Sequence, residues 1–126
     1  MGIRLVEAGP DRTIATMPVI GNRQPLGLLH GGATALLAET VGSVAASLAA
    51  GDNRFAVGIE LSISHHRSAT EGTVTATATA VQRGKTLATY VIEVVDEDGR
   101  RISSARLTCL LRESEKRPPA AGPTPL

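Results

Sequence analysis

The chain has 126 residues and a mass of 13.0 kDa, the size of one domain, and its 42% hydrophobic content excludes a chain that is disordered throughout. A net charge of +1 and an aromatic content of 2% argue against nucleic-acid binding, because both a basic surface and rings for stacking bases are lacking. The single cysteine, Cys109, excludes an internal disulfide and a cysteine metal cage, and no metal site is expected.

The first part of the chain predicts a β-hairpin followed by a loop. The runs IRLVEA and RTIATMPV favour strands and are separated by the turn residues GPD, so a hairpin is expected over residues 3–18. Residues 20–27 contain Gly, Asn and Pro and are expected to form a loop. Charges at Arg4 and Glu7 and the lack of a long apolar run argue against a signal peptide, so a cytoplasmic protein is expected.

One long helix is predicted after this loop. The segment is rich in Ala and Leu up to the stop Gly51-Asp52-Asn53, and some 20 helical residues would span about 30 Å. The run from Ala33 to Ala50 is long enough to suggest a membrane span, but Glu39 and the Thr and Ser content argue against one. The helix is apolar nearly all round, as a core helix is, and Gly42 would let its backbone approach neighbouring elements closely.

Beyond Phe55 the hydrophobic pattern changes to a period of two, which is typical of strands with one buried face. The run TVTATATAV alternates without exception, and Asp98-Gly99 is a strong signal for a hairpin turn. The predicted strands cover residues 57–69, 73–81, 86–96 and 100–111. Cys109 falls at an alternating apolar position of the last strand and is expected in the core.

The predicted order of elements indicates an α+β fold. An antiparallel sheet must cover one face, and only one helix is available, so the sheet is expected to curl around the helix over a single domain of residues 1–112. Residues 113–126 contain four of the seven prolines and are expected to form a disordered tail. Because one sheet cannot enclose every side of an apolar helix, a second subunit is expected to shield the remainder.

Glu39 is the only full charge between Arg23 and Asp52. A solvated helix face would carry several charges, so the sequence favours a carboxylate with a task over an exposed one. Burial would make this carboxylate a better proton acceptor near neutral pH, and it could also attack as a nucleophile. Ser43 lies one turn further on the same side, where its hydroxyl could hold a water molecule or a leaving group.

The sequence LHGG at the helix entrance suggests a binding site for a carbonyl oxygen. Gly31 and Gly32 would let a ligand approach the backbone, and the first N–H groups of a helix lack partners within the helix. An isolated His-Gly-Gly would indicate a turn with a structural His30, but here it precedes the lone carboxylate by nine residues. Gln24, in the preceding loop, is the nearest upstream amide.

The sequence HHRSATEG ends the predicted strand at residues 57–69. His65 and His66 are adjacent and should face opposite sides of the strand, so they are poor joint metal ligands. Arg67 and Ser68 together could bind a phosphate, although a solvated strand end fits the spacing equally well.

Three segments together resemble the hotdog-fold acyl-CoA thioesterases: QPLGLLHGGATALLAETVGSVA, VGIELSISHHRSATEG and DEDGRRISSARLT. The chain looks most like the branch of 4-hydroxybenzoyl-CoA, 1,4-dihydroxy-2-naphthoyl-CoA and phenylacetate-pathway thioesterases, over roughly residues 3–112. The resemblance implies a hotdog fold, dimers paired into tetramers, and hydrolysis of an aromatic or medium-sized acyl-CoA to the free acid and CoA. It implies no cofactor, because CoA is part of the substrate.

The resemblance also implies a role for each motif. Glu39 would act as nucleophile or general base, and the N–H of Gly31 would polarise the thioester carbonyl. The remaining implied residues are Gln24 and His30 beside that carbonyl, Ser43 near the reacting centre, and His65, Arg67 and Ser68 against CoA. In the family, each site is built across a subunit interface. Two other functions stay open: hydration or dehydration of an acyl thioester, and acyl-CoA binding without catalysis.

Overall fold

The structure, a computed structural model, describes residues 1–114, in which one helix packs against six strands. The elements in chain order are β1 (Arg4–Glu7), β2 (Arg12–Pro18), α1 (Gly31–Ala50), β3 (Arg54–His65), β4 (Thr73–Arg83), β5 (Leu87–Val95) and β6 (Arg101–Glu113). Of the predicted tail, Glu113 ends β6 and Ser114 donates its backbone N–H to the Asn53 carbonyl. The rest of that tail lies outside the described residues.

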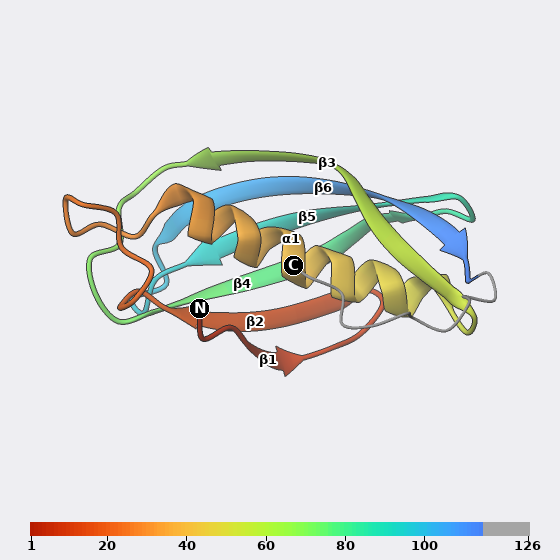
Figure 1. Cartoon of the computed structure of the whole chain (residues 1–126), viewed down its shortest axis with the longest axis horizontal. Helices are drawn as coiled ribbons and strands as arrows, with labels where there is room; N and C mark the ends of the chain where they lie inside the picture. Colours follow the sequence, from red (N-terminus) through yellow and green to blue (C-terminus); the bar gives the residue numbers. More distant parts are fainter. Residues whose placement is uncertain (115–126) are drawn as a thin grey trace, which may run out of the picture.

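The strands form one antiparallel sheet in the order β1-β2-β4-β5-β6-β3. The sheet curves behind α1, which crosses its concave face from the loop at residues 19–30 toward the start of β3 (Figure 1). Alternation in β4 directs Val74, Ala76 and Ala78 toward the helix, where all three are fully buried. The predicted α+β arrangement, a sheet curled around one long helix, is confirmed.

Both ends of β3 differ from the prediction. The helix ends at Gly51, which has φ +86°, and Asn53 is also left-handed with φ +60°, so the chain reverses within two residues. Arg54 donates its N–H to the Gly51 carbonyl, and the strand begins there rather than at residue 57. It ends at His65 rather than at residue 69, because beyond that point His66 and Arg67 donate their N–H groups to a single carbonyl of β6, that of Ile102.

Small residues let α1 approach the sheet closely. Ala45 and Ala46 are fully buried, and a Cβ placed on Gly42 would lie only 2.5 Å from Leu107 Cδ2 of β6. Such a distance is far below van der Waals contact, so glycine at position 42 is what allows Leu107 to pack against the helix backbone. The close approach that the sequence suggested for Gly42 is confirmed.

The core holds the one tyrosine and the one cysteine of the chain. Tyr90 of β5 is fully buried and donates its hydroxyl hydrogen to the Pro10 carbonyl, at an O···O distance of 2.5 Å, in the turn between β1 and β2. Burial raises the pKa of the Tyr90 phenol. Cys109 of β6 is fully buried as well, so the prediction that it belongs to the core is confirmed.

The side of α1 that faces away from the sheet is not covered by any element of residues 1–114 (Figure 1). Leu36 and Leu48 of the helix are 44% and 48% exposed. By length and composition α1 could cross a membrane, but half of the apolar window is buried inside the fold, which is the behaviour of a core helix. β3 stands at the edge of the sheet, and its Val57 and Ile59 are also exposed.

Candidate active site

The first turn of α1 leaves one backbone donor unused. His30 is the N-cap residue, and its Nδ1 accepts a hydrogen bond from the Gly32 N–H at 2.8 Å. Its carbonyl accepts the N–H groups of Ala33 and Thr34, at 2.9 and 3.2 Å. Among residues 1–114, no acceptor is hydrogen-bonded to the N–H of Gly31. The positive end of the helix therefore presents a single free donor, at Gly31.

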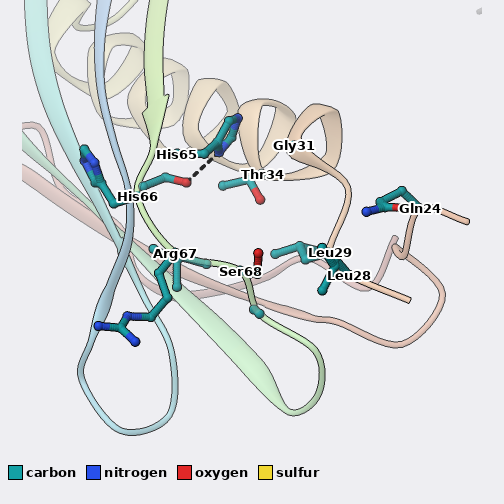
Figure 2. Close-up of a pocket in the computed structure, with 12 residues that line it drawn as sticks. Gln24, Leu28, Leu29, Gly31, Thr34, His65, His66, Arg67 and Ser68 are labelled. Atoms are coloured by element: carbon teal, nitrogen blue, oxygen red, sulfur yellow. Dashed lines mark hydrogen bonds between the residues drawn. The ribbon is translucent and has the colours of Figure 1, made fainter. Parts of the chain in front are cut away.

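A cavity of about 350 Å³ opens beside this donor. Gly31 and Thr34 of the helix form one wall, and the chain segment after β3 forms the opposite wall (Figure 2). The other lining residues are Gln24, Leu28, Leu29, His65, His66, Arg67, Ser68, Ala69, Ile102 and Ser103. The cavity thus combines the free helix donor with both apolar and hydrogen-bonding side chains, as a binding site for a polar-headed organic ligand does.

His65 packs against the start of the helix. Its Nδ1 lies 2.8 Å from the hydroxyl of the buried Ser103 on the neighbouring strand β6, and the two groups are hydrogen-bonded. On the other side of the ring, a Cβ on Gly31 would lie 2.9 Å from Nε2. Glycine at position 31 therefore makes room for the imidazole, and Ser103 fixes the orientation of the ring.

Two further polar groups point toward the helix donor. The Gln24 side-chain oxygen accepts the Leu26 N–H, which leaves the amide NH2 group as the end available to a ligand. The Ser68 hydroxyl points into the space between Thr34 and Leu29, whereas the Arg67 guanidinium points away from the helix (Figure 2). Arg67 therefore stands at the outer side of the cavity, where a charged part of a ligand would lie.

The two adjacent histidines turn to different partners. His66 Nε2 is hydrogen-bonded to the Ser104 hydroxyl at 3.0 Å, whereas His65 is bonded to Ser103. Since the residues alternate across the strands, the two rings lie on different sides of the sheet edge. His30 is exposed and its ring is engaged in capping the helix, so it acts on the cavity through the backbone rather than by lining it.

Glu39 lies two turns further along α1 and is half-buried. Its carboxylate rests on β3, where a Cβ on Gly58 would lie 2.8 Å from Oε2. All six salt bridges found in residues 1–114 are made by other residues. The lone carboxylate is therefore not neutralised by an ion pair within the described chain, and it is turned toward the sheet edge.

Polar residues of α1 form a row beneath β3 and β6. Ser43 lies beside the Cys109 thiol, and Ser47 accepts the Ala56 N–H of β3 at 3.3 Å. Burial raises the pKa of Cys109, the nearby Ser43 hydroxyl lowers it, and the Glu39 charge raises it again. Ser43 and Glu39 therefore belong to one local environment, as their i, i+4 spacing predicts.

Within one chain, the predicted residues form two groups rather than one. Gln24, Gly31 and His65 meet at the cavity with Arg67 and Ser68. Glu39 and Ser43 lie outside its lining, because eight residues of helix separate Gly31 from Glu39 by about 12 Å along the axis.

Two hydroxyl-bearing cavity residues were not singled out in the sequence. Thr34 and Ser103 are 2% and 1% exposed, yet both carry hydroxyl groups at the cavity wall. The spacing of Thr34 from Gly31, one helical turn, is a signal that could have found it. Ser103 depends on its cross-strand pairing with His65, which needs the order of the strands.

Comparison with known proteins gives one consistent result. Residues 26–103 match the sequence model of the family described as the Thioesterase superfamily. The chain is 43% identical over 109 residues to the 1,4-dihydroxy-2-naphthoyl-CoA hydrolase of Escherichia coli, covering 86% of this chain and 80% of that protein. The same identity, length and coverage hold for the proofreading thioesterase EntH of Cronobacter turicensis. A crystal structure of a Haemophilus influenzae thioesterase superposes with a TM-score of 0.85 at 35% identity, covering 89% of this chain and 79% of that one.

Proposed function

This chain belongs to the thioesterase superfamily and has its hotdog fold, and from that premise we propose that it hydrolyses an acyl-CoA with an aromatic or medium-sized acyl group to the free acid and CoA. Hydrolysis of a thioester is the activity shared by the named relatives. The choice of an aromatic acyl-CoA is supported by the E. coli relative, which is named for such an ester. The observation that carries the proposed mechanism is the free N–H of Gly31 at the wall of the cavity.

Gly31 is proposed to bind the thioester carbonyl oxygen. Negative charge develops on that oxygen when the carbonyl carbon is attacked, and a preorganised N–H at the positive end of a helix stabilises it. The Gln24 amide lines the same cavity and would complete the polar surroundings of the oxygen. Removal of one oxyanion donor typically costs about 100- to 1,000-fold in kcat.

Glu39 is proposed to supply the attack on the carbonyl carbon, by one of two routes. As a general base it takes a proton from water while the water oxygen bonds to the carbon, and the C–S bond then breaks to release the CoA thiolate. As a nucleophile its carboxylate oxygen bonds to the carbon, the thiolate leaves, and water hydrolyses the resulting anhydride. In both routes the thiolate gains one proton and the acid loses one at neutral pH. Ser43, one helical turn beyond Glu39, is proposed to hold the water.

The distance between Gly31 and Glu39 supports a site that is shared by two copies of the chain. A separation of about 12 Å along the helix is too long for both groups to reach one carbonyl. If two α1 helices face each other in opposite directions, Glu39 of one copy meets Gly31 of the other, with the two-fold axis midway between them near Ala35. The exposed Leu36 stands beside this axis, and the unpaired edge of β3 is open to strand addition. We therefore propose a dimer as the active unit, and a pair of dimers as the complete assembly.

The CoA part is proposed to lie along the segment after β3. His65, Arg67 and Ser68 offer an imidazole, a guanidinium and a hydroxyl to its phosphate and amide groups. No metal or other cofactor is part of the proposal, so dialysis against EDTA should leave kcat unchanged.

The first test is thiol release from a panel of aryl and aliphatic acyl-CoAs. Wild type should release CoA, and Glu39→Gln, which keeps the shape of the side chain but removes its charge, should lose at least about 100-fold in kcat. Full activity of a folded Glu39→Gln protein would refute the role of Glu39. Saturable binding of acyl-CoA without release would favour a binding protein, and a change in the acyl group with the thioester intact would favour a hydratase.

The two routes at Glu39 differ in where oxygen from water appears. In one turnover in H2¹⁸O, direct attack by water must place the label in the acid. Product that lacks the label, with the label recovered in Glu39, requires the anhydride.

A further inference from the structure

The backbone conformation at position 58 does not require glycine. Gly58 lies inside β3, and its φ is not in the left-handed region that favours glycine. In a strand interior, glycine costs conformational entropy and offers no side chain for packing. The reason for this glycine must therefore be the space it leaves.

That space is taken by the carboxylate of Glu39. A Cβ on Gly58 would lie 2.8 Å from Glu39 Oε2 and 3.7 Å from its carboxyl carbon. The nearest atom outside Glu39 is Leu107 Cδ1 at 3.5 Å, which is ordinary contact. A methyl group at position 58 would thus meet one atom at a forbidden distance, the reactive end of Glu39.

The strand is irregular at the same point. Gly58 pairs with Cys109 and Glu60 pairs with Thr108, so Ile59 is an extra residue that forms a β-bulge. Bulges turn the strand locally and occur next to active sites, where they re-aim neighbouring groups. The bulge and the missing side chain together form a seat for the carboxylate, which we call the Gly58 seat.

We propose that Gly58 is the positioning residue for Glu39, and that its empty side-chain volume holds Oε2 over β3 so that Oε1 is the oxygen that acts. This proposal rests on the proposed role of Glu39 in thioester hydrolysis. In this proposal β3 contributes to catalysis through the space that it leaves at Gly58, and none of its side chains takes part. Adding one methyl group at position 58 should displace the carboxylate without touching the cavity at Gly31.

The seat itself is tested by stability, independently of activity. Gly58→Ala is made in wild type and in Glu39→Ala, and Tm is measured for all four proteins. In Glu39→Ala the nearest atom to the new methyl is Leu107 Cδ1, at ordinary contact distance, so Tm should rise by about 2–4 °C, because alanine loses less entropy than glycine on folding. In wild type the rise should vanish, because the carboxylate must move. Equal rises in both backgrounds would overturn the proposal.

The positioning role is tested by kinetics on the same proteins. Gly58→Ala should lower kcat at least 10-fold and change KM less than 3-fold, because the substrate groups at the cavity are not altered. The same substitution should leave the residual kcat of Glu39→Ala unchanged, since no carboxylate is left to displace. An unchanged kcat in the wild-type background, with the Tm coupling present, would overturn the positioning role while thioester hydrolysis stands. A wild type that releases no thiol would instead refute the proposed function, a result that the Tm comparison keeps distinct.

Discussion

The close contact between α1 and β6 at Gly42 leads to a quantitative prediction for Gly42→Ala. At an open helix position, replacing glycine with alanine stabilises a protein by about 1 kcal/mol. Here the new Cβ would lie 2.5 Å from Leu107 Cδ2, and Leu107 is fully buried, so the core around it would have to rearrange. The substitution therefore combines a gain in helix propensity with a packing conflict.

The packing conflict should win. Inserting a methyl group into a well-packed core costs about 1–3 kcal/mol, and subtracting the helix gain leaves a net loss of up to about 2 kcal/mol. For a chain of 126 residues, each kcal/mol corresponds to a shift in Tm of about 4 °C. Gly42→Ala should thus lower Tm by as much as about 8 °C, whereas an open helix site would raise it by about 4 °C.

Chemical denaturation of four proteins checks this reasoning: wild type, Gly42→Ala, Leu107→Ala and the double variant. Leu107→Ala alone should cost about 2–5 kcal/mol, because it leaves a cavity in the core. In that background the nearest remaining Leu107 atom would be Cβ, at 3.4 Å from the added methyl, so Gly42→Ala should become stabilising. If Gly42→Ala raises the unfolding free energy of the wild type by about 1 kcal/mol, the proposed contact between helix and sheet is refuted.

Three further predictions follow from the site and the core. Ser103→Ala should raise KM for acyl-CoA by about 3- to 10-fold in steady-state assays, because one hydrogen bond that orients His65 is lost. Ser104→Ala is the matched control, and equal effects of the two substitutions on KM would contradict the role of Ser103. Leu36→Arg should yield a folded protein that is a monomer by light scattering and releases no thiol, since this side chain is 44% exposed in the single chain and lies beside the proposed two-fold axis. An active oligomer would rule out a two-fold axis near Leu36. Burial raises the pKa of the Cys109 thiol above its ordinary value of 9.0. The protonated thiol therefore contributes fully to the stability of the fold below pH 9.0, and this contribution is lost as the pH rises through the higher pKa of the folded state. Denaturation curves should therefore show wild type losing more stability than Cys109→Ala above that pH, and parallel losses would count against burial of the thiol.

Much of the fold follows from local patterns in the sequence. Strict alternation in TVTATATAV and the turn at Asp98-Gly99 fix where strands run and where they reverse. The early start of β3 could not be read in this way, because it depends on a left-handed Asn53 that compresses the turn after the helix. Strand order also lies beyond local pattern: β3 follows β2 in the chain, yet it pairs with β6 at the opposite edge of the sheet, with β4 and β5 between β2 and β6.

The site was predictable as a set of residues but not as a geometry. The lone charge of Glu39 in an apolar helix and the glycines at its entrance are visible in the sequence because their types are unusual there. The donor at Gly31 becomes unique only because the His30 side chain takes the neighbouring N–H, which is a matter of rotamer and not of spacing. Gly58 and Ser103 are 19 and 64 residues away in sequence from Glu39, so only the folded sheet reveals that one seats the carboxylate and the other holds the ring beside the cavity.

The hydrogen bond from Tyr90 to Pro10 has a practical consequence. The chain has no tryptophan and one tyrosine, so its near-ultraviolet absorbance and its intrinsic emission originate almost entirely from a single phenol. That phenol is shielded from water and bridges a central strand to the hairpin at the sheet's edge. The protein thus contains a built-in optical label at one defined position. Detachment of the N-terminal hairpin would break this hydrogen bond and change the tyrosine emission, whereas unwinding of the helix changes far-ultraviolet circular dichroism, so the two signals can time the two events separately.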